Sequence, residues 1–585
     1  RNNKNYNEIE KYKEVNSELV KNILDEAAKI NQNIILPLAK SGDDNPTILE
    51  NGVVRTPPGY KEAYTKFIED GWTSLSCDPK YGGQGMPKTV SAFFDEMLSS
   101  ASLSFKLYSE LSIGAYNCIH HHATEEIKKK YLPKMVEGKW SGTMCLTEPV
   151  CGTDLGLLKT KAEEQSDGTF KLNGQKIFIT SGDHDLTENI VHLVIARATD
   201  SPKGTKGISL FLVPKFKVND DGTIGERNNV NCVSIEEKMG VHGSATCVMS
   251  FEESTGYLIG ELNDGLAAMF SMMNTERIAV GLQGLGQAEI AYQNALAYSK
   301  DRIQGRDLKG ARNPEDEADP LIVHPDVRRM LLRSKAIIDS GRMLACWTAL
   351  AIDKYEKDPD PSVRKENFDL VELMTPIIKA MLTDYGVEIT SEMLQIFGGH
   401  GYIKEYGMEQ FYRDVRIAPI WEGTNGIQAL DLAGRKMPQH MGRLLRRFFH
   451  PALDFIEDNK EDDNLKEFVE PFAKALKGLQ KTSMYMAQRG LSNPYEIGAA
   501  ATDYLRQFGL VAMGYMWLLM LKVAFEKKDL DNYYEYKIIT ARFFFERILP
   551  ETLSRAIAIS SGSKTMMSLP DEGFDSVHKF TGAAN

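Results

Sequence analysis

The chain has 585 residues, 42% of them hydrophobic, which is enough for three or four domains with buried cores. Its formal net charge is -12, which argues against nucleic-acid binding, because that function needs a basic face to neutralise phosphates. The seven cysteines include no CxxC pair, so neither a disulfide framework nor a zinc site is supported, and a reducing compartment is expected.

Residues 1–140 are predicted to form an N-terminal helical domain. Apolar residues recur three and four positions apart in "NSELVKNILDEAAKINQNIILPLAK" and "TVSAFFDEMLSSASLSFKLYSELSIG". The stretches "NPTILENGVVRTPPG" and "DPKYGGQGMP" are rich in Gly and Pro and are interpreted as breaks. The first residues, "RNNKNYNEIEKYKEV", contain no apolar run typical of a secretory signal.

The pattern changes to short β-rich runs over residues 141–262. In "TFKLNGQKIFIT" the pair Asn173-Gly174 lies between β-formers, which is the strongest short-range signal for a hairpin. The runs "NIVHLVIARA", "GISLFLVP" and "TCVMSFEES" follow, all rich in β-branched or aromatic residues. We expect a middle β domain here, built as a small barrel or sandwich.

Helical periodicity returns at Asn263-Asp264, a pair that resembles a helix cap. Residues 263–437 are predicted to form a C-terminal four-helix-bundle domain, and residues 438–585 an additional helical domain. The apolar run "FGLVAMGYMWLLML" has 14 residues, fewer than the roughly 20 that span a bilayer. A buried bundle helix is therefore expected rather than an integral membrane segment.

Two motifs that suggest other chemistry are better explained structurally. "GLQGLG" has its glycines in the wrong order for a dinucleotide loop and lies inside a predicted helix, so close helix packing explains it better. His120, His121 and His122 point about 100° apart on a helix and cannot converge on one ion. We predict no metal site.

The segment "IAPIWEGTNGIQ" places one carboxylate, Glu422, between Trp421 and the flexible pair Gly423 and Thr424. A solvated loop glutamate is the ordinary interpretation. The alternative is a base at the rim of a dry pocket, because apolar surroundings raise the pKa of a carboxyl group and strengthen it as a base.

Two further patterns suit a flavin nucleotide. In "IFITSG", Phe178 and Thr180 share one strand face, where a ring and a hydroxyl can contact a flavin, although a core strand has the same pattern. In "DRIQGRD", Arg302 and Arg306 lie at a helix end, and two guanidinium groups there suit phosphate oxygens. A solvated last turn is the alternative.

The motifs between about residues 60 and 435 together resemble the acyl-CoA dehydrogenase family: "YGGQG", "IKKKYLPKMVEGKWSGTMCLTEPVCGTD", "LNGQKIFITSG", "EEKMGVHGSATC" and "QIFGGHGYIKEYGMEQFYRDVRIAPIWEGT". The resemblance implies an α+β multidomain enzyme that uses FAD to oxidise an acyl-CoA thioester to the 2,3-enoyl-CoA. It also implies an electron-transfer flavoprotein as the electron acceptor, a homodimer or homotetramer, and a cytoplasmic location.

The resemblance also implies roles for individual residues. Glu422 is expected to be the catalytic base; its rival is Glu276, at a helix position where some branches that generally lack the glutamate of "EGT" place their base. Arg277 and Gly423 are expected to contact the substrate. The residues expected to contact FAD are Thr147, Phe178, Thr180, Arg302, Gln395, Gly399 and Thr424, with Arg302, Gln395 and Gly399 reaching the FAD of a neighbouring subunit.

Some positions depart from the family pattern. Gly426 stands where a glutamine is common, which weakens the expected adenine contact, and Gln304 and Gly305 replace the commoner threonine and phenylalanine beside the pyrophosphate.

The C-terminal extension and "APIWEGTNGIQALDLAGRK" are similar to the branch of the family that acts on 3-methylmercaptopropionyl-CoA. The first expected reaction is therefore 3-methylthiopropionyl-CoA to methylthioacryloyl-CoA, in dimethylsulfoniopropionate demethylation. A straight-chain fatty acyl-CoA of β-oxidation is the second expectation, and an acyl-CoA oxidase is a different enzyme class. A flavin-bearing binding protein is the non-enzymatic alternative, and the intact "WEGT" and the acidic charge argue against it.

Overall fold

The computed structural model describes residues 9–575 and contains two compact units. Within the described residues, unit 1 comprises residues 9–334, 345–368 and 382–423, and unit 2 comprises residues 335–344, 369–381 and 424–575. Two long helices, α9 (Pro325–Lys357) and α10 (Pro361–Ile396), contribute residues to both units. Residues 1–8, which belong to the stretch inspected for a secretory signal, lie outside the described range.

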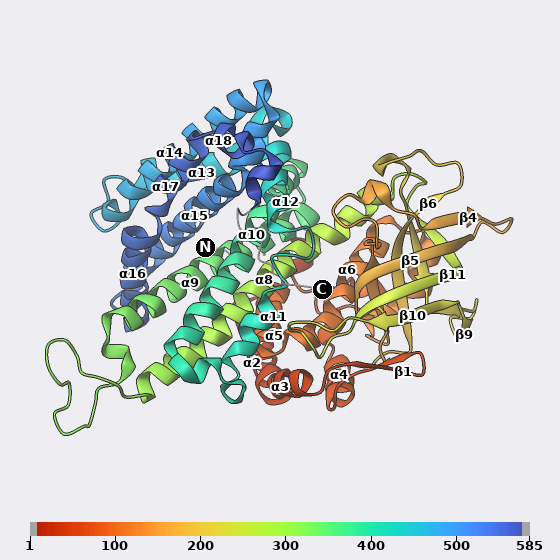
Figure 1. Ribbon diagram of the computed structural model, residues 1–585, viewed down its shortest axis with the longest axis horizontal. Helices are drawn as coiled ribbons and strands as arrows, with labels where there is room; N and C mark the ends of the chain where they lie inside the picture. Colours follow the sequence, from red (N-terminus) through yellow and green to blue (C-terminus); the bar gives the residue numbers. More distant parts are fainter. Residues whose placement is uncertain (1–8, 576–585) are drawn as a thin grey trace. The chain divides into compact units, whose positions relative to one another are not determined.

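Unit 1 contains a helical layer in which α5, α6 and α8 pack against one another (Figure 1). Ser102 begins α6, and its hydroxyl oxygen accepts a hydrogen bond from the backbone N–H of Phe105 at 3.3 Å, as an N-cap does. The α-helices that lie wholly in unit 1 are α2 (Ser17–Ile30), α3 (Leu36–Asp44), α4 (Tyr60–Glu69), α5 (Lys88–Ala101), α6 (Leu103–His122), α7 (Glu125–Val136), α8 (Gly265–Asp301) and α11 (Met408–Val415).

Five strands of unit 1 form a closed ring in the order β6-β7-β11-β5-β4, with β3 paired to β6 and β10 paired to β11, while β1-β2 and β8-β9 form separate two-stranded sheets. This arrangement confirms the predicted all-β region in its barrel form (Figure 1). The strands are β1 (Ile48–Glu50), β2 (Val53–Arg55), β3 (Trp140–Cys145), β4 (Lys161–Glu164), β5 (Phe170–Thr180), β6 (Asn189–Ala198), β7 (Ser209–Pro214), β8 (Phe216–Val218), β9 (Ile224–Arg227), β10 (Val230–Ile235) and β11 (Thr246–Ile259). The four domain boundaries proposed from the sequence stay predictions.

The hairpin predicted at Asn173-Gly174 is wrong, because β5 runs through this pair without turning. The turn between β4 and β5 lies earlier, where the N–H of Gln165 donates to the carbonyl oxygen of Thr169 at 2.8 Å. A Cβ on Gly174 would lie 2.4 Å from Thr160 Oγ1. This glycine therefore permits a close approach of two segments and forms no turn.

β1 and β2 form a hairpin in a segment that was predicted to be a break between helices. Asn51 and Gly52 form its turn with φ of 51° and 74°. Positive φ at both central residues is the requirement of the tight hairpin turn that Asn-Gly favours. The local signal was present, and the Gly/Pro-rich surroundings concealed it.

The glycines of "GLQGLG" lie inside α8 at close helix contacts, as predicted. A Cβ on Gly284 would lie 2.4 Å from the carbonyl oxygen of Leu382, and one on Gly286 would lie 2.6 Å from Ser99 Cβ. Small residues let helix backbones approach to these distances, so α5 and α8 meet without side chains between them at Gly286.

Unit 2 is helical, and its core surrounds α15. Trp517 of α15 is fully buried and donates its indole N–H to the carbonyl oxygen of Ala336 at 3.2 Å. Lys537 forms an ion pair with buried Asp339 at 2.7 Å. Its helices are α12 (Asn425–Leu430), α13 (Arg443–Asn459), α14 (Lys466–Ser492), α15 (Pro494–Lys527), α16 (Asn532–Phe543), α17 (Glu551–Ser560) and α18 (Lys564–Ser568).

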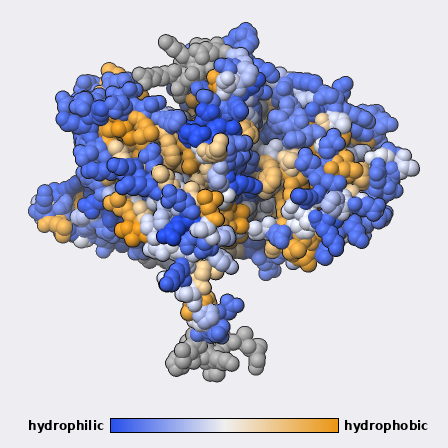
Figure 2. All heavy atoms as spheres, turned by 90° about the horizontal axis from the view of Figure 1, so that it is seen from above, coloured by the Kyte–Doolittle hydropathy of each residue, from blue (hydrophilic) through white to orange (hydrophobic). Residues whose placement is uncertain are grey.

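Among the described residues, α15 alone is long and apolar enough to cross a membrane. Its most apolar window is 72% buried within the protein, which is typical of a core helix and agrees with the expected buried helix. On the face seen in Figure 2, hydrophilic residues cover much of the surface, and hydrophobic residues form separate patches between them.

Candidate active site

The backbone at Glu422 is held in an uncommon conformation. Glu422 has φ of 55° and Gly423 has φ of 82°, so two successive residues are left-handed. Glycine adopts this region freely, whereas a glutamate there is strained and persists only where its surroundings fix it. Such strain often occurs at functional residues, and here it occurs at the residue that carries the predicted catalytic carboxyl group.

The surroundings of Glu422 are apolar. Trp421 and Ile417 pack against Leu103 and Leu107 of α6 and against Val241. The backbone N–H of Val241 donates to Asp414 of α11 at 2.5 Å, which fastens the start of this loop to the barrel. These contacts fix the position of the segment that leads into Glu422.

Arg277 of α8 connects that helix to the Glu422 loop. Its side chain is buried, its Nε donates to the carbonyl oxygen of Glu422 at 3.3 Å, and its Nη1 donates to Asn274 Oδ1 at 3.4 Å. The residue predicted to lie near the substrate therefore positions the backbone of the predicted base.

Glu276, the rival base, lies in the same site as Glu422. It is 1% exposed, and its Oε2 has no hydrogen-bond partner within residues 9–575. Burial raises the pKa of Glu276 well above its ordinary value of 4.5, and the Glu110 and Glu422 carboxyl groups raise this pKa further. The protein environment therefore favours the protonated form of Glu276.

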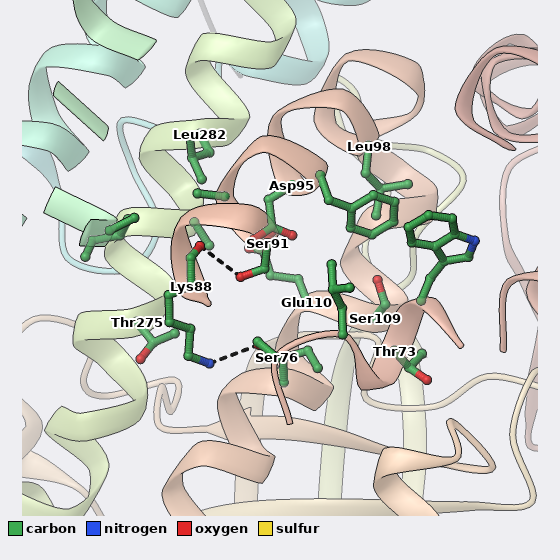
Figure 3. A pocket seen from close by; sticks show the side chains of 18 of the residues that line it. Thr73, Ser76, Lys88, Ser91, Asp95, Leu98, Ser109, Glu110, Thr275 and Leu282 are labelled. Atoms are coloured by element: carbon green, nitrogen blue, oxygen red, sulfur yellow. Dashed lines mark hydrogen bonds between the residues drawn. The ribbon is translucent and has the colours of Figure 1, made fainter. Parts of the chain in front are cut away.

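A cavity of about 100 Å³ lies beside Glu276, between α5, α6, α8 and the end of α9 (Figure 3). Phe67, Trp72 and Phe94 supply an aromatic part of its wall, and Asp95 and Glu110 supply carboxyl groups. An apolar cavity with a few polar groups is the usual form of a small-molecule site.

A polar network that was not predicted from the sequence lies at this cavity. Lys106 and Glu110 form an ion pair at 2.5 Å and are both buried, and Gln283 Nε2 donates to Glu110 Oε1 at 2.6 Å. Asp95 lines the same cavity, and burial raises its pKa to about 6. The available signal was a Lys and a Glu four residues apart on a largely apolar helix.

Thr147, Phe178 and Thr180 lie together on the barrel. The N–H of Ile177 donates to the carbonyl oxygen of Thr147 at 2.9 Å, and Phe178 is 59% exposed with φ of 58°, next to a shift in the β5–β11 register. Thr180 pairs with Thr246 of β11 in the register of the sheet, close to Phe178. An exposed ring beside two hydroxyl groups fits a planar ring system with a polar edge.

Arg302, Gln395 and Gly399 form a second, solvent-exposed group. The ring of Tyr298, one turn before Arg302, stacks on Phe397 with centroids 4.0 Å apart, and this contact brings the ends of α8 and α10 together. Exposure of all three residues fits their expected contact with a group from a neighbouring subunit. Thr424 belongs to unit 2, where it directly precedes α12.

Four domain families match successive parts of the chain. The acyl-CoA dehydrogenase N-terminal domain matches residues 20–139, the middle domain residues 143–254, and the C-terminal domain residues 263–437. The family described as acetyl-CoA dehydrogenase C-terminal like matches residues 448–570.

Three curated relatives are similar along nearly their whole length. The 3-methylmercaptopropionyl-CoA dehydrogenase of Ruegeria pomeroyi is 41% identical over 93% of this chain and 92% of its own. A butyryl-CoA dehydrogenase of Syntrophomonas wolfei is 35% identical over 94% and 93% of the two chains. A broad-specificity linear acyl-CoA dehydrogenase of Mycobacterium tuberculosis is 32% identical over 96% and 95%.

The fold is also that of solved members of the same group. An acyl-CoA dehydrogenase of Bacillus anthracis, solved with FAD, superimposes with a TM-score of 0.77 at 22% identity, over 95% of this chain and 91% of that one. The matched domains and the near full-length relatives together show that the chain belongs to the acyl-CoA dehydrogenase family of FAD-dependent enzymes.

Proposed function

We propose that this acyl-CoA dehydrogenase oxidises 3-methylthiopropionyl-CoA to methylthioacryloyl-CoA, with Glu422 as the catalytic base. The observation that supports the substrate is the 41% identity to a 3-methylmercaptopropionyl-CoA dehydrogenase, which includes the C-terminal extension. The observations that support the base are the strained backbone of Glu422, the apolar packing of Trp421 before it, and the hydrogen bond from Arg277, the neighbour of Glu276, to its carbonyl oxygen.

The reaction removes a weakly acidic proton from C2 of the thioester. The Glu422 carboxylate takes that proton, a hydride leaves C3, and the C2–C3 double bond forms. FAD, when bound, accepts the hydride and its two electrons. A carboxylate in apolar surroundings is a stronger base than one in water, because burial disfavours its charged form.

Negative charge gathers on the thioester oxygen as the C2 proton leaves. We infer that the backbone N–H of Glu422 donates to this oxygen, since preorganised donors at a developing charge are a large contribution to catalysis. Gly423 lacks a side chain and allows the thioester to approach. Arg277 keeps the loop in place through its bond to the carbonyl oxygen of Glu422.

The FAD contacts divide between the two groups of residues. Phe178 would pack on the ring system, with the Thr147 and Thr180 hydroxyl groups bonded to its polar edge. Arg302 would pair with the pyrophosphate, with Gln395 and Gly399 beside it, from a neighbouring subunit. Thr424 is also proposed to contact the flavin.

The same proposal includes an electron-transfer flavoprotein as acceptor, a homodimer or homotetramer, and a cytoplasmic location. A straight-chain acyl-CoA is the second candidate substrate, because relatives at 35% and 32% identity act on butyryl-CoA and on linear acyl-CoA thioesters.

Dye-reduction kinetics with methylthiopropionyl-, butyryl-, octanoyl- and palmitoyl-CoA test the substrate. We expect the highest kcat/KM with methylthiopropionyl-CoA. A higher value with butyryl-CoA would support the second candidate. Hydrogen peroxide released at the rate of turnover, without an added acceptor, would indicate an oxidase instead.

Paired substitutions test the base. We expect Glu422→Gln to lower kcat at least about a thousandfold while FAD stays bound, because no carboxylate remains to accept the C2 proton. Glu276→Gln should retain turnover within about tenfold of the wild type. The reverse pattern would assign the base to Glu276.

A further inference from the structure

Part of the cavity wall carries carboxyl groups, although a fatty acyl chain calls for an apolar wall. Glu110 and Asp95 both face the cavity, as Figure 3 shows. Lys106 lies behind Glu110 on the same face of α6 and is paired with it at 2.5 Å. The chemistry that the proposed function assigns to Glu422 uses none of these three residues.

Two contacts between α6 and α8 locate the ion pair relative to Glu276. Gly114 of α6 meets Glu276 of α8, since a Cβ on Gly114 would lie 2.1 Å from Glu276 Oε1. One turn before Gly114 on α6, Glu110 accepts a hydrogen bond from Gln283 of α8. Four residues of an α-helix rise about 6 Å, so Glu110 lies about that far along α6 from Gly114, and Lys106 lies one turn beyond Glu110.

The charged pair is difficult to displace. The carboxylates of Glu110 and Asp95 outweigh burial and raise the pKa of Lys106, so Lys106 stays charged. Glu110 is held by Lys106 on one side and by Gln283 on the other. Separating a buried ion pair leaves an uncompensated charge, at a cost of several kcal/mol.

We propose that Lys106 and Glu110, held by Gln283, form a charged floor that restricts this enzyme to short acyl groups. The inference rests on the proposed function and on the assignment of the acyl chain to the cavity beside Glu276. An acyl group about as long as a butyryl or methylthiopropionyl group ends before the floor. A longer alkyl chain must either push its terminal methylene groups against the carboxylate or separate the pair.

Two double variants distinguish this floor from a general loss of packing. Lys106→Met with Glu110→Ala removes both charges and opens space below the cavity. Lys106→Met with Glu110→Leu removes the same charges but fills the space. Both avoid a single unpaired buried charge, which would destabilise the protein for an unrelated reason.

The experiment measures kcat/KM for butyryl-, octanoyl- and palmitoyl-CoA, with FAD content and Tm for each protein. For the wild type we expect kcat/KM to fall at least about tenfold from butyryl- to octanoyl-CoA, since pocket misfit of this kind is worth a factor of 10 to 200. The alanine variant should raise the ratio of octanoyl to butyryl activity at least about tenfold. The leucine variant should leave that ratio within about threefold of the wild type.

Several outcomes overturn the inference. A wild type that uses octanoyl-CoA as well as butyryl-CoA shows that this floor does not limit the chain. An alanine variant that folds, binds FAD and keeps the wild-type ratio of octanoyl to butyryl activity shows this as well. If the alanine variant does not fold, the inference is tested by the wild-type fall in kcat/KM from butyryl- to octanoyl-CoA and by the activity ratio of the leucine variant. The absence of turnover by the FAD-loaded wild type with every thioester contradicts the proposed function instead.

Discussion

Glu276 and Glu422 place two carboxyl groups in one site, and only one of them can act as an unprotonated base. Burial, Glu110 and Glu422 all raise the pKa of Glu276, so its protonated form is favoured. A protonated carboxyl group cannot accept the C2 proton, which is consistent with Glu422 as the proposed base.

The raised pKa of Glu276 predicts how stability depends on pH. The folded protein holds this proton more tightly than the unfolded chain does, where the pKa is near the ordinary 4.5. Stability contributed by the bound proton is therefore complete below that value and is lost as pH rises toward the folded-state pKa. Glu276→Gln cannot ionise, so it should be spared this loss.

Thermal unfolding of wild type and Glu276→Gln from pH 5 to pH 9 measures the effect. We expect the Tm of the variant relative to wild type to rise with pH, by at least about 2 °C across the range. Glu405→Gln, at an exposed glutamate, is the control and should show no such trend. A constant difference between Glu276→Gln and wild type would mean that Glu276 is not held protonated.

At this scale the sequence predicted a base at Glu422, because its neighbours in the chain carry the pattern: an apolar segment before it and a flexible pair after it. Asp95, Lys106 and Glu110 could not be found in that way. Their role depends on α5, α6 and α8 meeting around one cavity, and each residue alone is an unremarkable helix position.

Among the secondary-structure elements, the contact between α5 and α8 controls the shape of that cavity. Gly286 lies against the α5 backbone at Glu96 and Ser100 and against Ser99 Cβ, within the turn that follows Asp95. Gln287 Nε2 donates to the carbonyl oxygen of Ser99 at 2.6 Å and fixes the register of the two helices. A side chain at position 286 would separate the helices.

Two matched glycine substitutions test this helix contact. Gly286→Ala should lower the free energy of unfolding by about 1–3 kcal/mol, the usual cost of overpacking a tight contact. Gly498→Ala in α15 has nothing within 4 Å of its new Cβ and should raise stability by about 0.5–1 kcal/mol, because alanine is the better helix former. Denaturant unfolding measures both. Equal effects would show that α5 and α8 have room to adjust.

Element types were largely predictable, whereas local turn signals were not reliable. Asn173-Gly174 carries the strongest hairpin pair and nevertheless lies within β5, because Thr160 packs against Gly174. Asn51-Gly52 carries the same pair and does form a hairpin. The difference lies in the tertiary contacts of each pair, which the local sequence does not contain.

At the scale of the whole molecule, unit 2 is built from segments that are not consecutive in the sequence. Residues 335–344 and 369–381 belong to the same compact unit as residues 424–585. Helices predicted as part of one four-helix bundle therefore contribute residues to both units. Periodicity locates each helix, but it does not indicate which neighbours a given turn of the helix will contact.

Asp369 tests how strongly the distant segments of unit 2 depend on one another. It is 2% exposed and accepts hydrogen bonds from Arg443 Nε at 2.8 Å, Arg443 Nη2 at 2.9 Å and Arg447 Nε at 3.3 Å. Asp369→Asn would remove the carboxylate that accepts these three hydrogen bonds and would weaken both charge pairs. We expect a loss of about 2–3 kcal/mol, below the range for a fully buried pair because both arginines are partly exposed.

The control is Asp503→Asn, whose ion pair with Arg555 is also within unit 2 but is more exposed, with 29% and 39% of the two side chains accessible. Surface pairs contribute at most about 1 kcal/mol, so this variant should stay close to wild type in urea unfolding followed by circular dichroism. Flavin fluorescence in the same titration reports on bound FAD. Equal destabilisation by the two variants would mean that Asp369 does not join these segments. A loss of FAD at the same urea concentration as the loss of helix, in Asp369→Asn as in wild type, would show that the whole chain unfolds as one cooperative system.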